Sequence, residues 1–450
     1  MIQLSTAAHI TATTEFGKIS AHIEGGKVLP LLASINTAIF CEMAGPVCGA
    51  RKRTVLRRYY EVILILLLFL TGSYCLAQMT MSPSVHGQRV PNTLIRAKEP
   101  IDAMQTHAEV KPGVVRTYYI AADEVDWDYT PRGRNLAGLP HVESAEDEAA
   151  GAGNHRIYHK AIYREYTDGT FKTLKVRPQQ WQHLGILGPL IRAEVGDSIR
   201  VVFRNNTHLI VTMHPHGLSY KKDAEGALYN DGTAGTVKAD DKVEPGGTYT
   251  YLWTAPESSG PAPMDGSSVL WMYHSHFVES TDINTGLVGP IIVTARGMAR
   301  PDGSPKDVDR EFITDFAIFD ETDSWFFERN VGKQARTFHS KALDPAMREA
   351  NALYTINGYI EANLPLLTMR RGEHVRWYLL SNANEDDIHM AHWHGNTAVW
   401  NRMRMDSIFL GPMAMATADM VPESEGIWLF HCHVSDHFKN GMVALYQVLP

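Results

Sequence analysis

Histidines form four His-x-His pairs in this sequence, two in each half. In an extended strand, residues i and i+2 point to the same face, so each pair presents two imidazoles side by side. The eight histidines in these pairs are His214, His216, His274, His276, His392, His394, His431 and His433. Eight imidazoles that converge at an interface between the halves would hold about three copper ions at two or three ligands each, with positions left open for oxygen.

The last pair encloses a cysteine, which predicts a second metal site. Cys432 stands between two paired histidines, so its sulfur is expected on the opposite face of the strand. His389 lies three residues before His392, and this odd step also turns it away from the pairs. A thiolate, two imidazoles and a more distant thioether are the ligand set of a blue-copper electron-transfer site. The predicted ligands of this second site are His389, Cys432, His437 and Met442.

The first half of the sequence lacks the residues for such a second site. Ser275 stands at the cysteine position, Val211 at the position of His389, and Ser280 where the second imidazole would be needed. We therefore expect the first half to keep its four paired imidazoles and to hold no blue-copper site.

Short β-rich runs, separated by Gly, Pro and Asn-Asp clusters, must position these side chains. Such runs predict an all-β fold of β-sandwiches, and examples are 198–203, 248–253, 287–294 and 375–380. A Gly-Asp or Gly-Glu turn, a strand and a His-x-His pair recur in both halves, at an offset of 176 residues for Gly196 and Gly372. The chain therefore reads as two copies of one sandwich, joined by a polar linker at 296–311.

Composition limits the class of protein. The chain has 450 residues, 42 Lys and Arg against 50 Asp and Glu, a net charge of −8, and 44% hydrophobic residues. This is ordinary globular composition with room for two or three domains. The mild acidity, without a basic stretch beyond the N-terminus, argues against a nucleic-acid partner.

Residues 1–77 are predicted to be an export signal with an upstream extension. Basic residues between positions 51 and 58 precede the nine-residue apolar run Val62–Leu70, and a small residue follows at Ala77. A bilayer helix needs about 20 apolar residues, so no stable membrane anchor is expected. The expected location is periplasmic or extracellular, and loss of the signal would leave Cys432 as the only cysteine, without a disulfide partner.

The C-terminal motif, with the spacing His-Cys-His-x3-His-x3-Gly-Met over residues 431–442, resembles the signature of multicopper oxidases. Segments of the first half resemble ceruloplasmin and its relatives, and these are residues 118–122, 124–129, 163–168 and 183–189. The resemblance spans residues 112–450. It implies two Greek-key cupredoxin-like domains in tandem, which we place at 112–297 and 310–450.

The resemblance also implies how four copper ions per active unit are held. Type 1 copper would be bound by His389, Cys432, His437 and Met442, and type 2 copper by His214 and His392. The type 3 pair would be bound by His216, His274, His276, His394, His431 and His433. Two-domain relatives close a ring as homotrimers, so a homotrimer is implied here, although the sequence leaves an intramolecular pairing open.

The implied reaction is one-electron oxidation of a phenol, an aromatic amine or a metal ion such as Fe(II), coupled to reduction of O2 to water, in a laccase or ferroxidase. Catalytic roles are expected for Cys432, His431, His433, Asp436 and Tyr220. Asp436 would attract Fe(II) or form a hydrogen bond with a phenol's proton, or is simply a solvated loop residue. Tyr220 would assist the type 2 copper, although packing is the favoured role.

Three alternatives remain open from sequence. A copper nitrite reductase needs type 1 copper in its first domain, which Ser275 disfavours. A non-enzymatic electron carrier or partner-binding protein has no need of eight intact ligands. A structural zinc site is closed by four ligands and would not pair histidines in this way. Methionines between positions 403 and 420 suggest Cu(I) handling or, as we prefer, core packing.

Overall fold

The computed structural model describes residues 13–15, 18–20, 113–139, 156–331, 345–382 and 388–450. In the unit Met1–Met104, the described residues form one hairpin of β1 (Thr13–Glu15) and β2 (Lys18–Ser20). The apolar run Val62–Leu70 and most of the predicted export signal lie outside the described residues. Across the described ranges, none of the helices combines the length and the apolar character needed to cross a bilayer.

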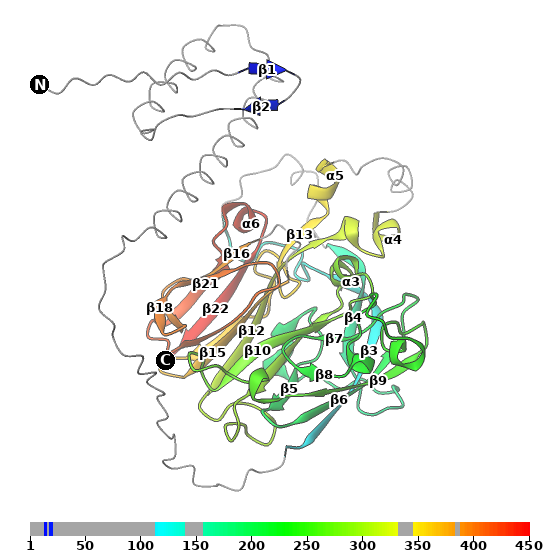
Figure 1. Ribbon diagram of the computed structural model, residues 1–450. Helices are drawn as coiled ribbons and strands as arrows, with labels where there is room; N and C mark the ends of the chain where they lie inside the picture. Colours follow the sequence, from blue (N-terminus) through cyan, green and yellow to red (C-terminus); the bar gives the residue numbers. More distant parts are fainter. Residues whose placement is uncertain (1–12, 16–17, 21–112, 140–155, 332–344, 383–387) are drawn as a thin grey trace, which may run out of the picture. The chain divides into compact units, whose positions relative to one another are not determined.

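The unit Gln105–Pro450 is built mainly from strands in four sheets (Figure 1). Strands between residues 115 and 294 make two sheets, which we call the first sandwich. Its five-stranded sheet has the order β4 (Ile157–Glu165), β3 (Val115–Asp128), β6 (Ser198–Asn205), β9 (Thr248–Thr254) and β8 (Ser219–Tyr220). Its four-stranded sheet has the order β5 (Ile191–Glu194), β11 (Val288–Thr294), β10 (Ser268–His274) and β7 (His214–Pro215). Its short helices are η1 (Gln179–Leu184), η2 (Lys222–Ala224), η3 (Gly235–Lys238), η4 (Glu257–Ser259) and α3 (Glu279–Thr285).

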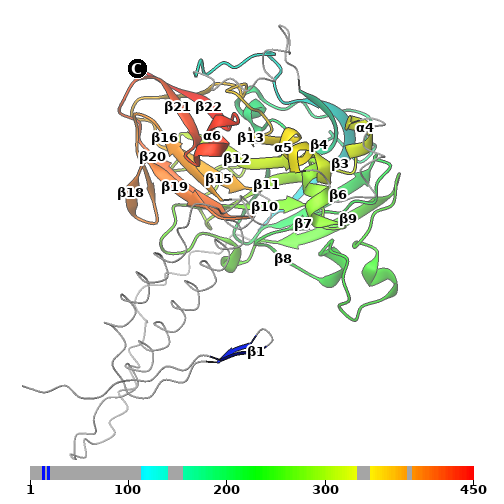
Figure 2. The same cartoon turned by 90° about the horizontal axis from the view of Figure 1, so that it is seen from above.

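Strands between residues 310 and 449 make the other two sheets, the second sandwich (Figure 2). Its six-stranded sheet has the order β13 (Ala352–Ile356), β12 (Arg310–Asp320), β15 (Val375–Ser381), β20 (Met415–Met420), β17 (Ala398–Trp400) and β18 (Met403–Met405). Its five-stranded sheet has the order β14 (Leu367–Arg370), β22 (Val443–Leu449), β21 (Gly426–Cys432), β16 (His389–Trp393) and β19 (Ser407–Leu410). Its short helices are η5 (Glu321–Asp323), α4 (Phe327–Val331), α5 (Pro345–Ala350) and α6 (Ser435–Lys439).

Both sandwiches pair their strands in the same pattern. β3 runs parallel to β6 as β12 does to β15, and β5 runs parallel to β11 as β14 does to β22. β10 is antiparallel to β11, as β21 is to β22. The prediction of an all-β fold with two sandwiches in tandem is confirmed. The domain bounds 112–297 and 310–450 stay a prediction, because both sandwiches belong to one compact unit.

Apolar side chains at alternate positions of the central strands fill each core. On β6, Ile199, Val201 and Phe203 have no exposed surface, whereas the residues between them are more exposed, as expected for a strand with one face on a core. The junction between the sandwiches is also apolar. There, Ile292 of β11 and Tyr378 of β15 belong to one buried cluster, and both strands are buried along their whole length.

The segment predicted as a linker is folded against both sandwiches. Its final residues, from Arg310, already belong to β12, and Glu311 pairs with Arg192 of β5 at 2.7 Å. Ala299 and Val308 are buried. The connection therefore holds the sandwiches together and is more ordered than its polar, Gly- and Pro-containing sequence predicts.

The methionines between positions 403 and 420 mainly pack. Met420 is buried in the second core, and Met405 packs against it. Met413 and Met415 pack against the cluster at the junction, while Met403 is 54% exposed. Four of the five thus have the packing role that we preferred.

Candidate metal centres

A buried cluster in the second sandwich brings one thiol and two imidazoles together. Cys432 ends β21, His389 begins β16, and His437 lies on α6. The Cys432 sulfur is 3.8 Å from Nδ1 of His389 and 3.5 Å from Nδ1 of His437, and the two nitrogens are 3.2 Å apart. β16 and β21 are paired, with Ala391 opposite Cys432, and this pairing brings residues distant in sequence to one point.

These distances fit a single first-row metal ion. Imidazole nitrogen and thiolate sulfur bind such ions at about 2.0–2.3 Å, so ligands of one ion lie about 3–4 Å apart. Burial lowers the pKa of His389 to about 3 and also lowers the pKa of His437, which keeps both rings neutral and able to donate a lone pair. Burial raises the pKa of the Cys432 thiol, and a bound metal ion would displace that proton. One sulfur and two imidazoles suit blue copper.

The backbone around the cluster holds the sulfur in place. The amide of Met390 donates to the Cys432 sulfur at 3.4 Å, and hydrogen bonds of this kind tune a metal–thiolate site. Met442 has no exposed surface; its carbonyl accepts from the Cys432 amide at 3.1 Å, and its amide donates to the carbonyl of His437 at 3.0 Å. The predicted distant ligand is therefore tied by main-chain bonds to two of the other three.

The first sandwich gathers the four paired histidines of the first half. His214 on β7 lies directly opposite His274 on β10 in an antiparallel pair. The Nε2 atoms of His216 and His274 are 2.9 Å apart, and the ring of His276 is centred 5.1 Å from that of His214. Ligand atoms of three of these side chains, His214, His216 and His274, lie within 4.8 Å of one another. We call these four residues the first histidine set.

The second sandwich arranges its four histidines in the same way. His392 on β16 lies opposite His431 on β21. The Nε2 atoms of His394 and His431 are 3.1 Å apart, and the ring of His433 is centred 5.0 Å from that of His392. We call these four residues the second histidine set. The sequence predicts both members of each His-x-His pair on a strand. In the structure each strand ends at the site, so the second member of all four pairs lies just past the end of its strand.

Backbone carbonyls determine which ring nitrogen is free in four of these histidines. Nδ1 of each lies 2.7–2.9 Å from a main-chain oxygen, and these residues are His214, His274, His392 and His431. A ring that donates from Nδ1 keeps its lone pair on Nε2, the usual arrangement of a metal-binding histidine. Burial lowers the pKa of His216 and of His431 to about 4, so these rings stay neutral at physiological pH.

The two histidine sets remain separate in the described part of one chain. None of the groups of converging ligand atoms found there combines residues of both sets. Each set by itself offers four imidazoles, half of the eight that the sequence predicts for one cluster. The eight-histidine site therefore stays a prediction.

Ser275 takes the place in the first sandwich that Cys432 takes in the second. The amide of Thr212 donates to the Ser275 hydroxyl at 3.0 Å, as a backbone amide does to the Cys432 sulfur. The hydroxyl donates in turn to Asp282 on α3 at 2.6 Å, and Val211 is fully buried where an imidazole would be needed. A hydroxyl–carboxylate pair fills this position. Nothing in the sequence pattern pointed to Asp282.

Two side chains with predicted catalytic roles lie near these clusters. Asp436 is exposed on α6, next to His437 in sequence, and its carboxylate is 3.8 Å from the Lys439 ammonium. Tyr220 on β8 is partly buried, with its ring centred 5.9 Å from the ring of His214 and nearly perpendicular to it. Both positions are compatible with the predicted roles, which stay predictions.

The sequence reasoning missed three residues beside the clusters. Tyr354 on β13 has its ring centred 5.3 Å from His437, and its hydroxyl donates to the exposed Glu349 at 3.2 Å. No sequence signal links these residues to the cysteine motif. Glu279 on α3 lies 3.4 Å from Nε2 of His276. An acid three residues after a candidate ligand was a signal that could have been used.

Comparison with known families decides the family of this chain. Two models of the multicopper oxidase family match residues 179–297 and 336–450, together more than half of the sequence. The chain belongs to the multicopper oxidase family. Each matched range contains the histidine set of its own sandwich, and the second also contains the cysteine cluster. Multicopper oxidases hold copper in type 1, type 2 and type 3 sites, so the predicted cofactor is confirmed for the family.

Several animal proteins are similar to this multicopper oxidase. Hephaestin of Rattus norvegicus is 39% identical over 346 residues, 75% of this chain and 30% of that protein. Ferroxidase HEPHL1 of Homo sapiens is 40% identical over 344 residues, 74% of this chain and 29% of that protein. Ceruloplasmin of Homo sapiens is 37% identical over 346 residues, 74% of this chain and 32% of that protein. The chain thus spans about a third of the length of these relatives.

The solved structures that this chain is similar to include two from Nitrosomonas europaea. A blue copper oxidase matches with a TM-score of 0.48 and 18% identity, over 74% of this chain and 86% of that one. A copper nitrite reductase matches with a TM-score of 0.48 and 17% identity, over 75% of this chain and 94% of that one.

Proposed function

We propose that the protein is an oxidase that takes electrons one at a time from a reducing substrate and reduces O2 to water. The observation that carries this proposal is the convergence of Cys432, His389 and His437 in one sandwich, together with a paired histidine set in each sandwich. The cysteine cluster, with Met442, would hold type 1 copper, and the two sets would hold the type 2 and type 3 ions. Copper bound in these sites would supply one-electron redox chemistry and four electrons per O2.

The chain itself joins the two kinds of site. Cys432 is bonded through the backbone to His431 and His433, so its sulfur faces one cluster and the flanking imidazoles face the other. The His431 imidazole stays neutral, because burial lowers its pKa to about 4. In this reaction the protein would hold the copper ligands in fixed positions, prevent other coordination geometries and supply protons.

Two substitutions test the separate roles of the cysteine cluster and the first histidine set. Cys432→Ser should abolish the blue colour and substrate oxidation while most of the other copper stays bound, because it removes only the thiolate. His214→Ala should keep the colour and stop oxygen uptake. Visible absorbance, copper content and an oxygen electrode give these three readouts. Oxygen uptake that survives in His214→Ala would overturn the assignment of the first set.

We further propose that the protein works as a homotrimer, with each cluster formed by the first histidine set of one subunit and the second set of its neighbour. The separation of the two sets within one chain supports this assembly. The same pairing pattern in both sandwiches also supports the internal repeat proposed from sequence. We also propose that residues 1–77 direct export of the protein to the periplasm or the extracellular space.

For the reducing substrate we propose a metal cation, Fe(II), in preference to phenols and aromatic amines. Two exposed carboxylates lie around His437: Asp436 precedes it on α6, and Glu349 accepts from the tyrosine whose ring lies against it. The net charge of −8 adds a weak attraction for cations that salt would screen. Among the similar proteins, those of Homo sapiens and Mus musculus called HEPHL1 bear the name ferroxidase.

This substrate proposal predicts that loss of the two carboxylates changes KM for Fe(II) and leaves KM for a phenol unchanged. The double variant Asp436→Asn/Glu349→Gln should raise KM for Fe(II) several-fold and leave KM for a neutral phenol unchanged, because only the cation loses its attraction. Steady-state rates at low ionic strength measure both. Glu425→Gln, an exposed acid of the same sandwich, serves as the matched control. Equal losses for both donors would contradict a cation site.

A further inference from the structure

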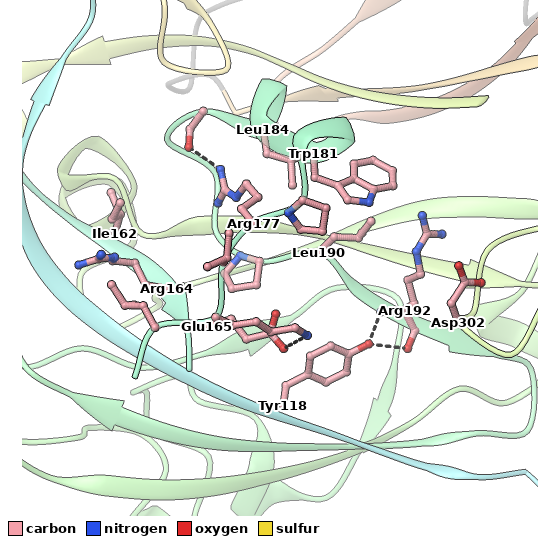
Figure 3. A pocket seen from close by; sticks show the side chains of 16 residues that line it. Tyr118, Ile162, Arg164, Glu165, Arg177, Trp181, Leu184, Leu190, Arg192 and Asp302 are labelled. Atoms are coloured by element: carbon pink, nitrogen blue, oxygen red, sulfur yellow. Dashed lines mark hydrogen bonds and ion pairs between the residues drawn. The ribbon is translucent and has the colours of Figure 1, made fainter. Parts of the chain in front are cut away.

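A cavity of about 560 Å3 opens in the first sandwich, and no candidate copper ligand lines it (Figure 3). Its walls come from the end of β4, residues 174–178, η1 and β5, and they are completed by Tyr118 of β3 and by Asp302. Small-molecule sites commonly measure about 300–1,000 Å3. The size of this cavity therefore suits a small organic molecule.

Two aromatic side chains of the cavity, Tyr118 and Trp181, contact Arg192. The Tyr118 hydroxyl donates to the carbonyl of Arg192 at 3.2 Å and accepts from its amide at 2.9 Å. The Arg192 guanidinium lies 5.2 Å from the centre of the Trp181 ring. Leu190 adds apolar surface between the two rings (Figure 3), and Leu174 also lines the cavity. An apolar or aromatic ligand would meet walls that need little reorganisation.

The cavity carries more positive than negative charge, in a chain whose net charge is −8. Its charged residues are Arg164, Lys175, Arg177, Arg192, Glu165 and Asp302. Lys175 pairs with Glu165 at 2.8 Å, and Arg192 pairs with Glu311 outside the cavity at 2.7 Å. These pairs leave two guanidinium groups, those of Arg164 and Arg177, against one carboxylate, that of Asp302.

Arg177 has no carboxylate partner within the described residues. It donates from two nitrogens to the carbonyls of Gly185 and Leu187, at 2.9 and 2.7 Å. Burial, and to a smaller extent the nearby charge of Arg164, lowers the pKa of Arg177. Arg164 itself has only a loose contact with Asp123, at 3.6 Å. Arg177 is half-buried and the Arg164 side chain is 36% exposed, and two such neighbouring guanidinium groups without a carboxylate at hydrogen-bond distance favour an anion beside them.

We propose that this cavity binds a small organic anion with an aromatic body, an aromatic carboxylate or sulfonate, with its charge at Arg164 and Arg177 and its ring against Trp181 and Tyr118. The site is distinct from the copper centres, so the proposal does not depend on the oxidase assignment.

A ligand bound in the cavity is expected to stabilise the junction between the two sandwiches. η1 forms one wall, and His183 at its end accepts from the amide of Ile313 on β12 at 3.2 Å. Asn357 donates to the carbonyl of His183 at 2.5 Å. A ligand that binds only the folded state raises the melting temperature. Because η1 contacts the second sandwich, we expect this increase for the whole unit Gln105–Pro450.

Isothermal titration calorimetry on the copper-loaded full chain tests the site with naphthalene-2-sulfonate, which carries an anion on an aromatic body. Its neutral counterpart, naphthalene-2-sulfonamide, is the matched ligand. We expect one site per chain for the sulfonate and binding about tenfold or more weaker for the sulfonamide, the usual scale of a lost charge-assisted hydrogen bond. Arg164→Gln and Arg177→Gln should each weaken the sulfonate several-fold and leave the sulfonamide unchanged.

Arg204→Gln makes the same charge change on β6, outside the cavity, and should bind the sulfonate like the wild type. Arg177→Gln removes bonds that hold the backbone, so circular dichroism must first establish that it folds; if it does not, Arg164→Gln decides by itself. No sulfonate binding, equal affinity for the two ligands, or wild-type affinity in the folded arginine variants would each overturn the proposal.

Discussion

Ser275 and Cys432 differ by one atom, sulfur against oxygen, yet their surroundings differ much more. Each accepts a hydrogen bond from a backbone amide, Ser275 from that of Thr212 just before β7 and Cys432 from that of Met390 on β16. Two imidazole nitrogens face the sulfur, whereas a carboxylate faces the hydroxyl. Asp282 also accepts from the amides of Phe277 and Val278 and from the indole of Trp325, at 2.8–3.1 Å. The first sandwich has thus filled this position with a hydrogen-bond network.

Removal of that carboxylate tests its structural role. Asp282→Ala should lower the free energy of unfolding by about 2–3 kcal/mol, because it leaves the buried Ser275 hydroxyl and three partly buried donors without an acceptor. Chemical denaturation measures the loss, and the blue absorbance of the folded variant should be unchanged. Asp265→Ala, at an exposed acid that accepts one amide, is the control and should change stability little. Loss of the blue colour in folded Asp282→Ala would mean that the network serves the copper site.

Tyr220 tests whether an aromatic side chain beside the first histidine set does more than pack. Its ring lies edge-on to the ring of His214, while its hydroxyl is the only part that a Phe would lack. If the hydroxyl assists the type 2 copper, Tyr220→Phe should leave the copper content unchanged and alter turnover. Copper analysis and steady-state oxygen uptake measure the two effects, and an unchanged turnover number would leave Tyr220 with a packing role alone.

At the scale of elements, the sequence predicted what depends on local pattern. The strands around Ile199 and Val375 follow from alternation or from continuous apolar runs, and the candidate ligands follow from spacing around Cys432. Contacts between segments that are far apart in the sequence could not be predicted from such patterns. Tyr354 reaches His437 only through the packing of β13, and Glu349 is linked to this ring only through the Tyr354 hydroxyl. Arg192 and Glu311, which pair at the end of the linker, are 119 residues apart.

A buried ion pair ties β4 to the start of the second sandwich. The Lys160 ammonium is 2.6 Å from the Glu321 carboxylate, neither side chain has exposed surface, and the Tyr129 hydroxyl donates to the same oxygen at 2.6 Å. Glu321→Gln should destabilise the fold by about 3–5 kcal/mol, because it leaves an unpaired buried ammonium. The double variant Lys160→Met/Glu321→Leu should recover much of that loss. Thermal and denaturant unfolding measure both, and a single variant as stable as the wild type would show that the pair contributes little.

At the scale of the whole molecule, the separate histidine sets make assembly a functional question. One variant lacks the first set (His214→Ala/His274→Ala) and another lacks the second (His392→Ala/His431→Ala). Each should be inactive alone, but trimers refolded from a mixture should regain part of the activity, because an intact first set then meets an intact second set of a neighbour. Light scattering gives the oligomeric state. A mixture as inactive as its components would place the whole cluster within one chain.

The central claim is that the cysteine cluster and the eight paired histidines together carry out a complete reduction of oxygen. The most direct test is the number of Fe(II) ions oxidised per O2 consumed by the copper-loaded protein, with hydrogen peroxide measured in the same sample. The account predicts four Fe(II) per O2 and no peroxide. A ratio of two with one peroxide per O2, or no oxygen uptake by fully copper-loaded blue protein with any donor, would contradict it.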